Sequence, residues 1–159
     1  MIFELLDKTF PTFEGEFSDE KLFQSFNRYR ILSPMRRGIY GTTALNQAIL
    51  NHYETKAGYG SFMKIPIMIN RNDYAQGLFN GETGILIKKR SNNDRYAPPF
   101  DEEDYALFPG ESESTFRRVP ALLLPPFEYG YCLSVHKSQG SEFDHVLLLL
   151  PEGSEQFGR

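Results

Sequence analysis

The chain has 159 residues, of which 40% are hydrophobic, 24% charged and 14% aromatic, a composition that excludes a disordered protein. Its single cysteine, Cys132, cannot form an intramolecular disulfide, and three histidines give no clustered spacing for zinc. The longest aliphatic run, residues 146–150, is far shorter than the ~20 residues of a membrane helix, and the N-terminus lacks the pattern of a signal peptide. We therefore expect a cytoplasmic protein with no membrane partner and no metal site.

The net charge of −4 conceals an uneven distribution along the chain. Residues 1–20 and 99–116 are acidic, whereas residues 21–98 hold twelve basic against four acidic side chains. Basic surface is typical of phosphate binding, although a solvated charged face is the alternative explanation. The acidic total is therefore no argument against a nucleic-acid ligand.

The N-terminal part predicts little regular structure before residue 18. Residues 1–17 alternate short apolar pieces with acids, and we expect an irregular segment there. A short helix over 18–26, capped by Ser18 or Asp19, should follow. Residues 29–33 then predict a buried strand, which ends at a proline.

A second helix is predicted to begin at Thr42 or Thr43, either of which can act as its cap, and to end at Gly58. Its expected buried face follows the three-four spacing of an α-helix. That face comprises Leu45, Ala48, Ile49 and Tyr53.

Beyond residue 60 the hydrophobic period changes from helical to two, which indicates short strands. The expected strands cover 65–69, 84–88, 105–108 and 119–124, with a hairpin-type turn at 91–94. Such spacing favours a small barrel or a twisted meander. The acidic run 101–104 mimics a Walker B box, but no apolar strand precedes it, and we interpret it as a solvated loop.

The last segment returns to an α/β pattern. A strand over 131–135 is followed by a polar loop or helical turn over 136–142 and by a second strand over 145–150. Cys132 lies in the first of these strands and is interpreted as a buried structural thiol. Since ligands of open α/β sheets bind beyond the carboxyl ends of strands, the polar residues after 133 are functional candidates.

Residues 134–144, SVHKSQGSEFD, resemble motif V of superfamily-one DNA helicases, in the version found in RecD-type alpha subunits of exodeoxyribonuclease V. Two further stretches are similar to the same family. LSPMRRG at 32–38 resembles motif IV, and IMINRNDY at 67–74 with LFNGETG at 78–84 resembles motif IVa. The ordered match extends over residues ~30–150, nearly the whole chain.

The resemblance implies contacts with single-stranded DNA. Ser134 and His136 would face the DNA phosphates, as neutral donors that position the backbone without reading sequence. For His136 the alternative is a histidine satisfied in the core. Lys137 would reach DNA or be solvated, and Arg71 and Asn72 would lie along the DNA path, whereas we interpret Asn80-Gly81 as a tight turn.

The resemblance also implies contacts with ATP. Arg36 would neutralise the charge that develops on the transferred phosphoryl group, although the adjacent Arg37 is an alternative. Glu142 would lie near the ribose. Gln139 and Gly140 would approach the γ-phosphate or couple it to the DNA, unless they form an exposed polar turn.

The fold class implied is α/β. Residues 1–63 and 129–159 would form a second RecA-like motor domain, truncated before motif VI, and residues 64–128 an inserted Src-homology-3-like β-barrel. No Gly-x-x-x-x-Gly-Lys-Ser/Thr loop occurs in the sequence, so the chain alone should not hydrolyse ATP. Most ligands of ATP and Mg²⁺ would belong to a missing first domain.

The implied intact protein is an ATP-dependent helicase that moves 5′ to 3′ along single-stranded DNA. It would assemble with the beta and gamma subunits of exodeoxyribonuclease V in double-strand-break repair. A stand-alone RecD-like helicase is the nearest alternative. A non-catalytic DNA-binding or subunit-docking module and a separate RNA-binding barrel are the alternatives from other classes.

Overall fold

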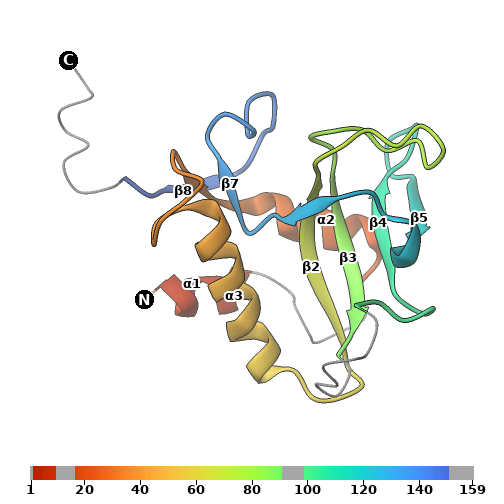
Figure 1. The fold of residues 1–159 in the computed structure, drawn as a ribbon, viewed down its shortest axis with the longest axis horizontal. Helices are drawn as coiled ribbons and strands as arrows, with labels where there is room; N and C mark the ends of the chain where they lie inside the picture. Colours follow the sequence, from red (N-terminus) through yellow and green to blue (C-terminus); the bar gives the residue numbers. More distant parts are fainter. Residues whose placement is uncertain (1, 10–16, 91–98, 151–159) are drawn as a thin grey trace.

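The computed structural model describes residues 2–9, 17–90 and 99–150. They form an α/β fold with one parallel and one antiparallel sheet (Figure 1). The elements are α1 (Ile2–Thr9), α2 (Asp19–Arg28), β1 (Tyr29–Ser33), α3 (Thr42–Lys56), β2 (Phe62–Ile69), β3 (Thr83–Lys89), β4 (Tyr105–Pro109), β5 (Phe116–Pro120), the 3₁₀ helix η1 (Ala121–Leu123), β6 (Phe127–Tyr129), β7 (Cys132–Ser134) and β8 (His145–Leu148). The turn predicted at 91–94 lies outside the described residues.

The parallel sheet has the strand order β7-β1-β8. Strand β1 runs parallel to both neighbours, and Ser33 is the register partner of Ser134. The strand predicted over 29–33 is confirmed, and those predicted over 131–135 and 145–150 form with shorter bounds. The central strand is mostly buried, with Arg30, Ile31 and Ser33 inside, because strands of a parallel sheet are usually covered on both faces.

The helices α1 and α2 differ in how well sequence predicted them. Ser18 is the cap of α2, since its Oγ accepts a hydrogen bond from the Lys21 amide. The irregular structure expected before residue 18 is wrong for residues 2–9, which form α1. Asp7 of α1 pairs with His52 and Lys56 of α3, a tertiary contact that no local pattern reveals.

Helix α3 is capped differently from the prediction. Its N-cap is Gly41, and a Cβ there would lie only 2.6 Å from the Arg36 carbonyl oxygen, so a glycine is required. Thr42 is instead buried in the first turn. Ala48 is exposed rather than buried, because the helix turns another set of residues toward the core. The buried residues are Thr42, Asn46, Ile49, Leu50 and Tyr53.

The antiparallel sheet has the order β5-β4-β3-β2-β6. The strand predicted over 119–124 is wrong in its bounds: β5 ends at Pro120, and residues 121–123 form η1. The apolar residues 121–124 suggested a buried strand, but Leu122 and Leu123 are exposed. Strand β6, which pairs with β2 through Ile67 and Tyr129, was not predicted. The Src-homology-3-like barrel stays a prediction.

One hydrophobic cluster joins α2 and α3 with the strands of both sheets. Cys132 is fully buried in this cluster, and burial raises the pKa of its thiol to about 12. The prediction of a structural thiol is therefore confirmed. None of the described helices has the length and apolar character needed to cross a membrane.

Asp104 corrects the interpretation of residues 101–104 as a solvated loop. Residues 101–103 are exposed, but Asp104 is only 2% exposed. Its carboxylate accepts hydrogen bonds from the backbone amides of Lys89, at 2.8 Å, and Asp101, at 2.9 Å. The side chain therefore holds the end of β3 to the turn before β4, a role set by tertiary structure.

Replacing Asp104 with alanine is expected to lower the free energy of unfolding by about 2–4 kcal/mol, because two backbone donors lose their acceptor in a partly buried place. Urea denaturation followed by circular dichroism measures the change. The exposed Glu102→Ala is the matched control and should have little effect. Equal stability of the two variants would show that the hydrogen bonds of Asp104 make no net contribution to the free energy of unfolding.

Candidate functional site

The candidate site lies at the carboxyl edge of the parallel sheet. Because β1 and β7 are adjacent and parallel, with Ser33 opposite Ser134, the loops 34–41 and 135–144 leave the sheet at the same edge. The hydroxyl of Ser33 donates to the Tyr40 carbonyl at 2.6 Å and accepts from the Met35 amide at 3.2 Å. Loop 34–41 is thereby folded back on the end of its own strand.

Loop 34–41 presents Arg36 and Arg37 to solvent, both on its exposed surface. Within the described residues, neither guanidinium has a hydrogen-bond or ion-pair partner. Nothing in their burial distinguishes one arginine from the other. Both cations are thus available to an anionic ligand at this edge.

The first turn of loop 135–144 is closed by Ser134 and Ser138. The Lys137 amide donates to Ser134 Oγ at 3.1 Å, and the Ser138 hydroxyl donates to the Val135 carbonyl at 2.8 Å. His136 and Gln139 are exposed on this turn. The alternative of a core-satisfied histidine is therefore excluded for His136. Gly140, at φ +84°, has the left-handed backbone that glycine favours.

Lys137 is not simply solvated, the alternative that the sequence left open. Its ammonium donates to Asn70 Oδ1 at 2.9 Å and to Glu128 Oε1 at 3.0 Å. Asn70 follows β2, and Glu128 is in β6, so the contact ties the motif V loop to the antiparallel sheet. Asn70 is 67 positions from Lys137 and Glu128 is nine positions from it, and no local pattern in the sequence predicted either contact.

A cavity of about 980 Å³ lies between α2 and the second half of loop 135–144. Glu142 and Asp144 line it from the loop, and Asn27 and Arg28 line it from α2. Arg36, Gln139 and Gly140 are not among the lining residues. Of the residues predicted to contact ATP, Glu142 lines this cavity, and α2 contributes lining residues that sequence reasoning missed.

Arg30 holds the loop that forms this cavity. Its side chain is buried, which lowers the pKa of the guanidinium to about 10. It donates to the carbonyls of Phe26 and Tyr29, and it lies 5.2 Å from the ring centroid of Phe143. This cation–π contact fixes the residue next to Glu142.

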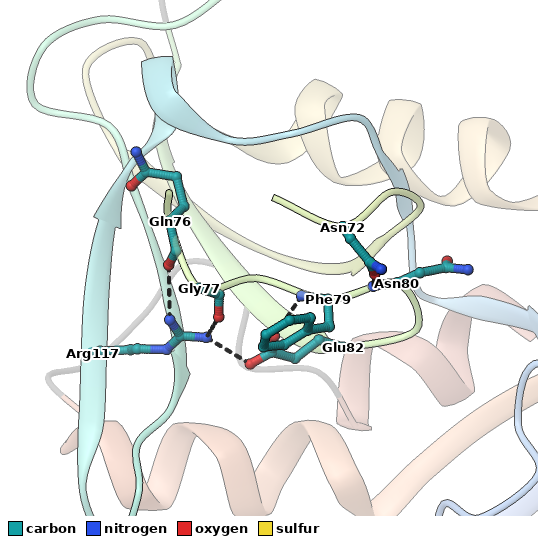
Figure 2. A network of polar contacts seen from close by, with 7 residues as sticks. All are labelled: Asn72, Gln76, Gly77, Phe79, Asn80, Glu82 and Arg117. Carbon is teal, nitrogen blue, oxygen red and sulfur yellow. Dashed lines mark hydrogen bonds and ion pairs between the residues drawn. The ribbon is translucent and has the colours of Figure 1, made fainter. Parts of the chain in front are cut away.

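Arg71 and Asn72 lie in the connection 70–82 between β2 and β3. Arg71 is exposed, whereas the side chain of Asn72 accepts a hydrogen bond from the Asn80 amide at 2.8 Å. Figure 2 shows these two asparagines side by side. Gly81 has φ +90°, and the Glu82 amide donates to the Phe79 carbonyl at 3.0 Å across Asn80-Gly81, so the predicted tight turn is confirmed. Asn72 thus has a structural role in addition to any contact with a ligand.

The edge combines neutral hydrogen-bond donors with exposed cations, a set suited to phosphate oxygens. Among the described residues, no group of three or more His, Cys, Asp or Glu side chains is arranged to hold a metal ion. The geometry therefore defines a candidate site for a phosphate-bearing ligand.

Comparison with known proteins gives relatives of one type. The chain is 27% identical over 140 residues to the RecBCD enzyme subunit RecD of Haemophilus influenzae, covering 83% of this chain and 18% of that protein. It is 24% identical to the subunit RecD of Buchnera aphidicola subsp. Schizaphis graminum, covering 83% of this chain and 22% of that protein. It is 31% identical to the ATP-dependent RecD2 DNA helicase of Deinococcus radiodurans, covering 77% of this chain and 16% of that protein.

These relatives are all RecD-type proteins, and one of them is named as an ATP-dependent DNA helicase. The chain is homologous to the RecD-type proteins over about four-fifths of its length. It spans about a fifth of the length of the relatives it matches. No family model matches the chain.

Proposed function

We propose that this chain is part of the second RecA-like motor domain of an ATP-dependent 5′–3′ DNA helicase of RecD type, acting in the cytoplasm in double-strand-break repair. The register of Ser33 with Ser134 carries this proposal, because it brings the loops of motifs IV and V to one sheet edge. Residues 1–63 and 129–159 would form the motor domain, and residues 64–128 an inserted Src-homology-3-like barrel. The beta and gamma subunits of exodeoxyribonuclease V would be its protein partners, unless the longer protein is a stand-alone RecD-like helicase.

The proposed DNA contacts begin with Ser134 and His136. Ser134 Oγ accepts the Lys137 amide hydrogen, so its own O–H is left to donate to a phosphate oxygen. His136 is exposed one step further along the loop. Lys137, paired with Glu128, would act mainly by holding this loop in place, and Arg71 would add positive charge nearby.

The proposed nucleotide contacts lie on Arg36 and around Glu142. The cavity beside Glu142 has the volume of a small-molecule site, and its carboxylate can accept hydrogen bonds from ribose hydroxyls. Arg36 would lie against the terminal phosphates, with Gln139 and Gly140 between them and the DNA. ATP and Mg²⁺ would be held mostly by a first domain that carries the phosphate loop, so the 159-residue chain alone should not hydrolyse ATP.

The DNA part of this proposal is testable with the chain itself. Fluorescence anisotropy with labelled oligothymidylate should show binding that weakens as salt rises from about 50 to about 200 mM. His136→Ala should weaken binding roughly 10- to 100-fold, the loss of one hydrogen bond to a charged group.

His145→Ala is the matched control for His136→Ala. His145 is also exposed but lies at the amino end of β8, at the opposite edge of the same sheet. The His145→Ala variant should bind oligothymidylate with unchanged affinity. Binding that is absent at low salt, or that responds equally to both variants, would refute the DNA contact.

One observation favours the alternative of a subunit-docking module. Val146, Leu147 and Leu148 of the edge strand β8 are all exposed, although such side chains are normally covered. Another part of a longer protein or a partner subunit would cover them. Absence of DNA binding in the test above would favour docking as the main role of this chain.

A further inference from the structure

The connection 70–82 exposes two aromatic side chains. Tyr74 is 79% and Phe79 50% exposed, and their ring centroids lie 5.9 Å apart in an edge-to-face arrangement. Large apolar rings at the surface gain little from the fold itself, because most of their area stays in water. The exposed positions of Tyr74 and Phe79 are therefore better explained by binding to a ligand than by a contribution to stability.

The backbone that carries the two rings is fixed from within. Asp73 Oδ1 accepts hydrogen bonds from the amides of Ala75 and Gln76, at 3.0 and 3.1 Å. Asp73 and Leu78 exchange two backbone hydrogen bonds, at 2.7 and 2.9 Å. Leu78 is fully buried and anchors the connection to the core.

Arg117 of β5 clamps the same connection from outside. Its guanidinium donates to the carbonyls of Gln76 and Gly77, at 3.0 and 2.8 Å, and to Glu82 Oε1 at 2.8 Å. The other oxygen of Glu82 accepts the Phe79 amide at 3.0 Å, so the clamp reaches the residue that bears a ring (Figure 2). A surface held this way loses little conformational entropy when it binds.

The charges near the rings balance and so do not repel an anionic partner, because the acidic Asp73 and Glu82 are matched by the basic Arg71 and Arg117. Both carboxylates of the connection, Asp73 and Glu82, accept hydrogen bonds from the connection itself, and Glu82 is also paired with Arg117. Arg71 is left as an exposed charge. The Asn70–Lys137 hydrogen bond joins the start of the connection to the loop that carries His136.

We propose that Tyr74 and Phe79 form a stacking platform for the bases of single-stranded DNA whose phosphates lie against the carboxyl edge of the parallel sheet. This inference rests on the proposed function and extends it from contacts with phosphates to contacts with bases. Stacking is sequence-tolerant, because every base has an aromatic face, and it suits a protein that moves along any DNA.

Anisotropy of the 159-residue chain with labelled oligothymidylate tests the platform. Tyr74→Ala and Phe79→Ala should each weaken binding roughly 5- to 100-fold, the range expected for loss of one stacked base. Tyr74→Phe should bind as the wild type does. Tyr59→Ala is the matched control, because Tyr59 is also exposed but precedes β2, at the end of the strand away from connection 70–82, and it should have no effect.

An abasic oligonucleotide of equal length separates stacking from other effects. The wild-type chain should bind the abasic oligonucleotide more weakly than oligothymidylate. The two alanine variants should bind the abasic oligonucleotide with the same affinity as the wild type. Wild-type binding that is salt-sensitive and sensitive to His136→Ala, but unchanged in both aromatic variants, would overturn the platform and leave the proposed function standing. No DNA binding by the wild type would overturn both, and the aromatic pair would then be a protein contact.

Discussion

Replacing Arg36 with alanine is expected to reduce DNA-stimulated ATPase roughly 10³- to 10⁵-fold in the longer protein that we propose contains this chain. An arginine on the far side of a nucleotide cleft stabilises the charge that develops on the transferred phosphoryl group, and alanine removes that cation. Loop 34–41 suits this role because the Ser33 hydroxyl fixes its shape while the arginine stays exposed. Phosphate release with and without single-stranded DNA measures the effect.

Arg37→Ala is the matched control, since Arg37 is adjacent and equally exposed. It should retain most of the activity. Arg36→Lys should recover little, because an ammonium lacks the planar fork of a guanidinium. A larger loss in Arg37→Ala would reassign the role to that residue. Undiminished ATPase in both Arg36→Ala and Glu142→Ala would remove the nucleotide site from this edge.

Replacing Asn46 with alanine is expected to lower the free energy of unfolding by about 3–4 kcal/mol. Asn46 is 5% exposed, and its side-chain amide pairs with the backbone of Cys132 through two hydrogen bonds of 2.8 Å. Alanine would leave both a buried N–H and a buried C=O of β7 without a partner. Since β7 delivers Ser134 and His136 to the site, DNA affinity should fall as well.

Gln47→Ala tests whether this effect is specific. Gln47 is the next residue of α3 and is exposed, and within the described part of the chain its side chain bonds to Asn51, so its loss should cost little stability. Asn46→Asp keeps the acceptor for the Cys132 amide but turns a second oxygen toward the Cys132 carbonyl, and it should be at least as destabilising as alanine. Urea denaturation measures all three. Equal stability of Asn46→Ala and Gln47→Ala would contradict the role of this pairing.

Local sequence patterns predicted the elements that depend on local chemistry. The strand at 29–33 and the cap at Ser18 follow from apolar runs, prolines and capping side chains. The prediction failed where a tertiary contact overrides local preference. Residues 2–9 become helical against α3, and Gly41 rather than a threonine caps α3, because backbone approach leaves no room for a side chain.

The sequence by itself determined the family to which the chain is similar and the residues of its motif loops, because those residues are contiguous. Only the tertiary structure decided what their neighbours do. Asn46 and Cys132 are 86 positions apart, and Lys137 and Asn70 are 67 positions apart. The first contact depends on how α3 packs on the parallel sheet and the second on how the two sheets lie together. The polar contacts that hold the site and clamp the exposed aromatic pair therefore appear only in the folded chain.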